Sequence, residues 1–116
     1  MCTARPKWMS ISQQPQTYKD RMYRVSLDGL DNILEIDPDG LTARVEPGVT
    51  IGRLNRVLVS RGLTLPVVPE LDELTVGGLV MGGGIESTSH KHGLLHHCCT
   101  EYELVAADGT VMVANR

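Results

Sequence analysis

The chain lacks phenylalanine altogether, and aromatic residues make up only 3% of its 116 residues. Its core must therefore be built from aliphatic side chains and methionine. Lysine and arginine (11) are outnumbered by aspartate and glutamate (14), which gives a formal net charge of −3. Nucleic-acid binding requires a concentration of positive charge. Since the sequence contains no basic run, we expect no nucleic-acid partner.

Long hydrophobic runs are also missing. A membrane-spanning helix needs about 20 consecutive apolar residues, and this sequence contains only short apolar segments. Its first ten residues, MCTARPKWMS, contain no apolar core of a signal peptide. The three cysteines are an odd number, and Cys98 and Cys99 are adjacent. This usage predicts reduced thiols in a reducing compartment rather than a disulfide framework.

The residues that are present indicate one small domain of the α+β class. Short segments of alternating apolar and polar residues predict strands. Thr50 is a suitable helix N-cap, and apolar residues follow it at helical spacing until Gly62, a suitable C′ residue. The expected elements are a strand within 23–30, a hairpin over 32–46, a helix from position 51, and a second hairpin over 98–114. The sequence shows no internal repeat.

The final hairpin bears on domain organisation. Two strands joined by an Asp-Gly turn are marginally stable alone and normally continue into a larger sheet. Because the sequence ends soon after such a hairpin, we expect the chain to be a fragment of a longer protein.

Glycine is concentrated in one place. Six of the twelve glycines fall within residues 75–93, TVGGLVMGGGIESTSHKHG. Glycine costs about 0.5–1 kcal/mol relative to alanine inside a helix or strand, so this concentration needs a reason. The segment does not match the Walker loop, which requires G-x-x-x-x-G-K-[ST]. Its G-x-G-x-x-S sequence at 82–87 is only a weak match to the Rossmann fingerprint.

Two interpretations of this segment remain open from the residues alone. In the first, Thr75 caps a helical turn over 76–81, and the amides of Val76, Gly77 and Gly78 are unpartnered donors that hold a diphosphate. Residues 82–84 would then run beneath a planar ring, with the nearby hydroxyl groups adding polar contacts. In the second interpretation, the glycines only allow two elements to pack closely.

Several motifs resemble those of a known family over nearly the whole chain. VEPGVTIGRLNRVLVSRGLTLPV, LTVGGLVMGGGIESTSHKHGLL and YELVAADGT, in that order, resemble the PCMH-type FAD-binding domain of the vanillyl-alcohol oxidase superfamily. MCTARPKW, PELDELTVGGL and GIESTSHKHGL are similar to signatures of the Δ24-sterol reductase family within it. The resemblance implies mixed sheets with flanking helices.

The resemblance also implies a function. Residues 1–116 would be part of an FAD-binding domain, and the family's N-terminal membrane segment, the start of the domain and the C-terminal substrate domain would lie outside this chain. The complete enzyme would be an oxidoreductase of sterol biosynthesis that reduces the Δ24 double bond of a sterol, with NADPH as electron donor. Its expected location is the cytosolic face of the endoplasmic reticulum membrane. The alternative is a truncated, non-catalytic domain for flavin binding or interaction.

The segment of this chain that corresponds to the family's FAD contact is residues 75–87. Some relatives attach FAD covalently through a histidine in an upstream loop. Because no histidine precedes His90, we expect FAD to be bound non-covalently. No residue can be assigned as the catalytic acid. The implied FAD-binding residues are Thr75, Val76, Gly77, Gly78, Leu79, Val80, Met81, Gly82, Gly83, Gly84, Ile85, Glu86 and Ser87.

Potential metal ligands gather shortly after these residues, but their spacing does not favour a metal. An H-x-H pair followed by H-H-C-C lacks the C-x₂-C pair typical of zinc sites, and adjacent residues on a strand face opposite sides. We therefore expect no metal and two cysteines that enter the sheet. For His90 and Lys91 two interpretations stay open, a contact with flavin or phosphate and a solvent-exposed loop. The residues concerned are His90, His92, His96, His97, Cys98 and Cys99.

Other charged residues near the glycines have simpler interpretations. The acidic segment 70–74 is expected to be solvated, as such polar runs usually are. We therefore expect no catalytic role for it, because a catalytic carboxyl would need burial to raise its pKa. Glu86 is expected to accept a hydrogen bond from a ribityl or ribose hydroxyl of the cofactor. Arg53 and Arg56 are expected on the solvent-facing side of the helix that starts at position 51.

Overall fold

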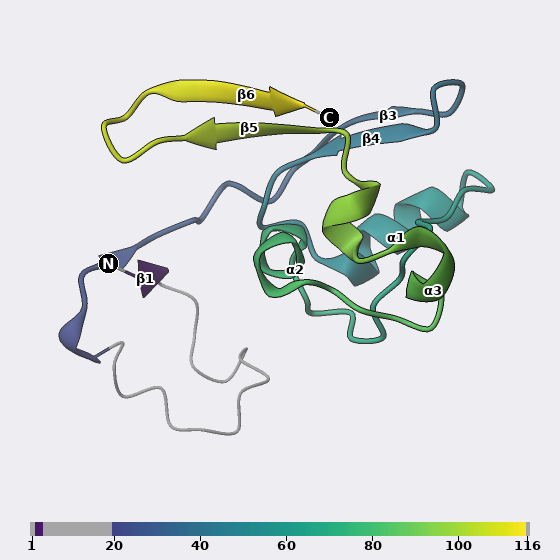
Figure 1. Ribbon diagram of the computed structural model, residues 1–116, viewed down its shortest axis with the longest axis horizontal. Coiled ribbons are helices and arrows are strands. Elements are labelled where there is room, and N and C mark those ends of the chain that lie inside the picture. The colour runs from purple at the N-terminus through teal and green to yellow at the C-terminus, as the bar shows by residue number, and fades with distance from the viewer. Residues whose placement is uncertain (1, 4–19, 116) are drawn as a thin grey trace.

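The computed structural model describes residues 2–3 and 20–115 (Figure 1). Four short strands precede a run of helices, and two strands follow it, so the predicted α+β class is confirmed. No helix in these residues is long and apolar enough to cross a membrane. The elements are β1 (Cys2–Thr3), β2 (Arg24–Val25), β3 (Ile33–Asp37), β4 (Thr42–Val45), α1 (Ile51–Val59), α2 (Val76–Gly82), α3 (Ser89–His92), the 3-10 helix η3 (Leu95–Cys98), β5 (Glu101–Val105) and β6 (Val111–Asn115).

The strands form separate two-stranded pairs. β1 and β2 are parallel, whereas β3–β4 and β5–β6 are antiparallel hairpins. Both predicted hairpins are therefore confirmed. The strand predicted within 23–30 is shorter than expected, because the chain turns after β2 and the Leu30 N–H donates to the Leu27 carbonyl at 3.1 Å.

The expectation that Cys98 and Cys99 enter the second hairpin is wrong. The chain folds there into η3 because Leu95 is buried in the core, and β5 begins only at Glu101. The Cys98 sulfur lies 3.8 Å from the Leu94 carbonyl oxygen, and the Cys99 sulfur lies 3.6 Å from that of Leu95. Both cysteines are half-buried.

Helix α1 forms where the sequence predicts it. The Thr50 hydroxyl accepts the Arg53 N–H at 3.3 Å, which is the expected N-cap bond. The helix ends at Val59 with Ser60 as its C-cap, so Arg61 occupies the C′ position and Gly62, the predicted C′ residue, lies one position further on. Gly62 nevertheless has the positive φ (+73°) that favours glycine after a helix, because the chain makes a further turn before it reverses.

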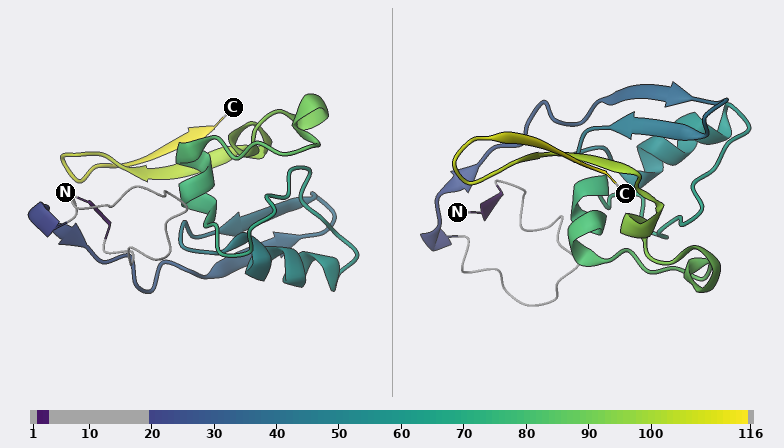
Figure 2. Two further views of the ribbon diagram at one scale, coloured as in Figure 1. Left: turned by 90° about the horizontal axis from the view of Figure 1, so that it is seen from below. Right: turned by 45° about the horizontal axis from the view of Figure 1, so that its top comes forward.

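The core lies between the helices and the β3–β4 hairpin, which covers α1 (Figure 2). It consists of two adjoining clusters of aliphatic side chains, as expected for a chain without phenylalanine. One cluster joins both helices to η3, and the other joins α1 to the hairpin. The buried members are Ile51, Val67, Leu79 and Leu95 in the first cluster and Val49, Leu54 and Leu58 in the second.

The first N–H groups of α1 and α2 find their hydrogen-bond acceptors in the segment that precedes the other helix. The segments 47–50 and 72–75, which precede the two helices, meet at an antiparallel bridge between Thr50 and Thr75. Each segment supplies backbone carbonyls to N–H groups at the start of the other helix. We call these two segments the helix clamp. It fixes the position of α2 relative to α1.

The helix clamp corrects the expectation that the sequence has no internal repeat. VTIGRL at 49–54 and LTVGGL at 74–79 share the pattern apolar-Thr-apolar-Gly-x-Leu. In both copies the threonine hydroxyl accepts the N–H of the residue three positions later at 3.3 Å, and the final leucine is buried. The repeat escaped notice because it covers only two helix starts and not a whole supersecondary unit.

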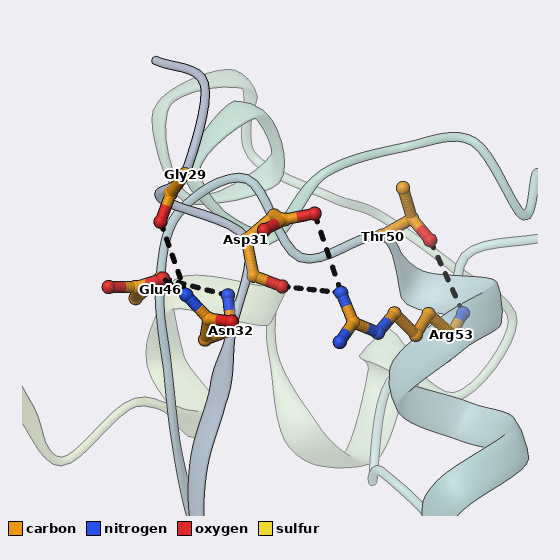
Figure 3. A network of polar contacts seen from close by, with 6 residues as sticks. All are labelled: Gly29, Asp31, Asn32, Glu46, Thr50 and Arg53. Atoms are coloured by element: carbon orange, nitrogen blue, oxygen red, sulfur yellow. Dashed lines mark hydrogen bonds and ion pairs between the residues drawn. The ribbon is translucent and has the colours of Figure 1, made fainter.

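A polar network holds the loop before β3 against α1 and β4 (Figure 3). The Arg53 guanidinium donates to the Asp31 carbonyl at 2.6 Å and lies 3.5 Å from the Asp31 carboxylate. The backbone and side-chain N–H groups of Asn32 both donate to one Glu46 carboxylate oxygen at 2.7 Å. Arg53 is 48% exposed, as expected for the outer side of the helix, but it also anchors this loop.

The β5–β6 hairpin extends away from the helices (Figures 1 and 2). Its first strand is attached by the Tyr102 hydroxyl, which donates to the His96 carbonyl at 3.0 Å, and by the Arg44–Glu103 ion pair at 3.3 Å. Most of its apolar side chains remain exposed, among them Val113.

Candidate functional site

The helix expected after Thr75 is present as α2, one residue longer than predicted. The Thr75 hydroxyl accepts the Gly78 N–H at 3.3 Å, which is the predicted N-cap bond. Beyond α2 the chain turns through residues 83–88, here called the glycine turn, before α3 begins. The thirteen residues implied as FAD contacts are therefore the cap, the helix and the first part of this turn.

The expectation that the first amides of α2 are unpartnered is wrong. The Val76 N–H donates to the Val49 carbonyl and the Gly77 N–H donates to the Pro47 carbonyl, both at 2.9 Å. The Gly78 N–H is taken by the N-cap hydroxyl. The helix clamp thus satisfies these donors within the chain, and no N–H group at this helix start is left for a diphosphate.

Internal packing explains several of the glycines. A Cβ at Gly77 would lie 2.7 Å from the Pro47 Cβ, so close packing of two elements accounts for this residue. Gly83 and Gly84 have φ angles of +100° and +44°, which other residues rarely adopt. Gly82 is different, because its φ is not positive and an added Cβ would meet nothing within 4 Å. The fold gives no reason for glycine at that exposed position.

The glycine turn contains donors that α2 lacks. Within the described part of the chain, the amides of Gly84, Ile85 and Ser87 donate no hydrogen bond. The side chains of Met81 and Ile85 are 89% and 74% exposed, although both are apolar. The end of α2 and the glycine turn therefore combine unpartnered N–H groups, a bare glycine surface and exposed apolar side chains.

Side chains of the turn fasten it to the preceding loop. The Thr88 hydroxyl donates to the Pro66 carbonyl at 2.8 Å, and the Glu86 carboxylate accepts the Glu70 N–H at 3.2 Å. The Ser89 hydroxyl accepts the Glu86 N–H at 2.9 Å. One Glu86 oxygen thus holds the loop, and contact of Glu86 with a cofactor hydroxyl stays a prediction.

The histidines after the turn make bonds to the backbone. His90 Nδ1 lies 2.7 Å from the Ser87 carbonyl, which makes this nitrogen the donor. His97 Nδ1 instead accepts the Leu94 N–H at 2.9 Å. Among the residues that the structure describes, no three His, Cys, Asp or Glu side chains are grouped to hold a metal ion. Contact of His90 or Lys91 with a cofactor stays a prediction.

The acidic segment 70–74 lies at the start of α1. The Arg56 guanidinium pairs with the Asp72 carboxylate at 3.0 Å, and these side chains are 71% and 65% exposed. This agrees with the expectation of a solvated surface, where ion pairs contribute little to stability. The backbone of the segment matters more, because it carries one half of the helix clamp.

A surface depression of about 290 Å³ lies between β3 and α1. It contains none of residues 75–87, so it is separate from the glycine turn. Its lining is partly apolar and partly charged: Ile33, Leu34, Glu35, Ile36, Arg53, Val57 and Arg61.

Gly52 was missed in the sequence because it lies outside the glycine-rich segment. A Cβ there would lie 2.3 Å from the Asp72 Cγ, so this glycine is required by the helix clamp just as Gly77 is. The signal that could have found it is the Thr-x-Gly-x-Leu pattern shared by Thr50 and Thr75.

Comparison with known proteins covers the whole site. Residues 2–115 match the sequence model of the FAD binding domain family. The chain is 54% identical to Delta(24)-sterol reductase of Homo sapiens over 110 residues, which is 95% of this chain and 21% of that protein. It is 44% identical to Delta(24)-sterol reductase of Pisum sativum over 117 residues, covering 100% of this chain and 21% of that protein.

A more distant relative is named as an oxidase. L-gulonolactone oxidase of Mus musculus is 31% identical over 90 residues, which is 78% of this chain and 20% of that protein. The chain thus spans about a fifth of the length of the relatives it matches.

The family match includes the helix clamp, α2 and the glycine turn. It confirms the resemblance of the sequence motifs to FAD-binding domains. The chain belongs to the FAD binding domain family.

Proposed function

We propose that this chain is the FAD-binding part of an oxidoreductase that reduces the Δ24 double bond of a sterol, with NADPH as electron donor. The observation that carries the proposal is the 54% identity to a Delta(24)-sterol reductase over 95% of the chain. Residues 1–116 would form part of the FAD-binding domain, and a longer protein would supply the membrane segment, the start of the domain and the substrate domain. Its location would be the cytosolic face of the endoplasmic reticulum membrane.

FAD, when bound, supplies the hydride chemistry between NADPH and the sterol double bond. The task of this chain is to hold FAD non-covalently and to orient it. Residues 75–87 form the proposed binding segment, and the contacts within it divide into two parts. The start of α2 acts through its position, since its amides are used by the helix clamp. The end of α2 and the glycine turn make the contacts.

The properties of the glycine turn fit the chemistry of FAD. The unpartnered amides of Gly84, Ile85 and Ser87 are suitable donors for phosphate oxygens. The exposed apolar side chains of Met81 and Ile85 are suitable neighbours for a planar ring. Gly82 would let the cofactor approach the backbone closely. It lies at the end of a helix with open space at its Cβ position, so the fold itself does not require glycine there.

Substitution of Gly82 tests this site without disturbing the fold. In Gly82→Leu, the added Cβ would meet nothing within 4 Å, and leucine is a better helix former than glycine by roughly 0.5–1 kcal/mol. We therefore expect unchanged or slightly raised thermal stability together with loss of bound FAD. The measurement is the visible absorbance of flavin that remains with the purified chain after gel filtration with added FAD.

Val59→Leu is the matched control, since Val59 is the last residue of α1 as Gly82 is of α2. It should retain FAD to the same extent as the unchanged chain. Equal retention by Gly82→Leu and the control would place the FAD contact elsewhere in the chain. A colourless unchanged chain at saturating FAD would contradict binding by these 116 residues.

A further inference from the structure

We infer that Gly52 and Gly77 are a matched pair of positioning residues for the glycine turn, and that neither contacts FAD. The inference rests on the proposed function of the glycine turn. It assigns a role in cofactor binding to Gly52, which lies in α1, outside the glycine-rich segment. It also removes Gly77 from the residues that touch the ligand.

The backbone hydrogen bonds of the helix clamp come in equivalent pairs. The Gly52 N–H donates to the Asp72 carbonyl at 3.1 Å, and the Gly77 N–H donates to the Pro47 carbonyl at 2.9 Å. Because Gly52 and Gly77 occupy the same place in the repeat, as do Pro47 and Asp72, each bond is the counterpart of the other. The N–H groups just before the two glycines are paired in the same way, at 2.8 and 2.9 Å. The clamp therefore has an approximate two-fold symmetry.

The same symmetry holds for side-chain space. A Cβ at Gly52 would lie 2.3 Å from the Asp72 Cγ and 2.6 Å from its Cβ. A Cβ at Gly77 would lie 2.7 Å from the Pro47 Cβ and 3.1 Å from its carbonyl oxygen. These distances are too short for a real side chain, so Gly52→Ala would push Asp72 away from α1, and Gly77→Ala would push Pro47 away from α2.

A change in the helix clamp is transmitted to the glycine turn through α2. The helix continues directly into the turn, where the Gly83 N–H donates to the Leu79 carbonyl at 2.8 Å. The Gly84 carbonyl then accepts the Leu95 N–H at 3.1 Å, which ties the turn to η3. Because α2 is only seven residues long, a displacement at its start is carried to its end. Gly52 and Gly77 should therefore have equal effects on ligand binding.

The test compares Gly52→Ala with Gly77→Ala, and measures both thermal unfolding and the dissociation constant for FAD. Each substitution should lower the Tm by about 5–15 °C, as expected for overpacking of a chain of this size. Each should also weaken FAD binding by about tenfold or more. A ligand contact by Gly77 alone would instead give a loss of binding in Gly77→Ala and none in Gly52→Ala.

Second substitutions show whether the lost space is the cause. Asp72→Gly removes the three atoms that lie nearest to a Cβ at position 52, so it should restore most of the Tm and of the FAD affinity lost in Gly52→Ala. Pro47→Gly should restore part of what Gly77→Ala loses, since the Pro47 carbonyl stays in place. Each pair is read as a double-mutant cycle, with Asp72→Gly and Pro47→Gly as the single-variant references.

The thermal and ligand measurements separate failure of the inference from failure of the proposed function. If the unchanged chain binds no FAD, the proposed site fails, but recovery of Tm in the two cycles still establishes the matched pair. Additive Tm changes in both cycles would overturn the inference. So would a Gly77→Ala chain that keeps its Tm, loses FAD and is not rescued by Pro47→Gly.

Discussion

The helix clamp and the β5–β6 hairpin use similar aliphatic residues with opposite results. Around the clamp, Val49, Ile51 and Val67 are 0%, 1% and 0% exposed. In the hairpin, Val105 and Val113 are 73% and 60% exposed, although both strands are fully paired with each other. Backbone pairing alone therefore does not bury a side chain. Burial requires a second layer, which the two helices, η3 and the β3–β4 hairpin supply only around the clamp.

The difference also bears on function. The region around the clamp holds the proposed FAD site in a defined geometry, because its helix starts and core are satisfied within the chain. The hairpin leaves apolar side chains uncovered, which is typical of surfaces that pack against other protein.

The largest expected contrast comes from truncating one aliphatic residue in each region. Ile51→Ala removes a buried side chain from the core around the clamp and should lower the free energy of unfolding by about 2–5 kcal/mol. Val113→Ala in the hairpin should change it by about 0.5 kcal/mol or less. Urea denaturation followed by circular dichroism measures both. Similar losses in the two variants would mean that the hairpin is buried as deeply as the core.

The caps of the helix clamp should have intermediate and equal effects. Thr50→Ala and Thr75→Ala each remove an N-cap hydroxyl and should each cost about 1 kcal/mol of stability. Thr50→Ser and Thr75→Ser are the controls, because serine keeps the hydroxyl and should keep most of the stability. A cost confined to one of the two threonines would contradict the symmetry of the clamp.

The smallest effect concerns the turn of the β5–β6 hairpin. The Thr110 N–H donates to the Asp108 carboxylate at 2.9 Å, and bonds from Thr110 hold the pKa of that carboxyl below its ordinary value of 3.8. A pKa that is lowered in the folded state means that the ionised carboxylate stabilises the turn. This stabilisation is fully present when the pH is above the ordinary pKa, and it is lost as the pH falls through the folded pKa. The Thr110 amide resonance should therefore titrate with a midpoint below 3.8, and this step should vanish in Asp108→Asn. A midpoint at or above 3.8 would contradict the bond.

Much of the local structure could be predicted from the sequence. The hairpin over 32–46, the caps Thr50 and Thr75, and the α+β class follow from local patterns, because turn chemistry and N-cap preference act over a few residues. The motifs around the glycines were also sufficient to identify the FAD-binding family.

The pairing of distant segments could not be predicted in the same way. The state of the amides at Val76 and Gly77 depends on carbonyls of segment 47–50, and a helix start read alone always has unpartnered donors. Glycine can be required by a bound ligand or by a packed neighbour, and the sequence is the same in both cases. Only the positions of Pro47 and Asp72 distinguish them.

Amide resonances of the isotopically labelled chain, followed by NMR during titration with FAD, test the division of the site most directly. The amides of Gly84, Ile85 and Ser87 should show the largest shifts, while those of Val76 and Gly77 keep their hydrogen bonds and change little. The largest shifts at Val76 and Gly77, with the glycine turn unchanged, would contradict this account of the site.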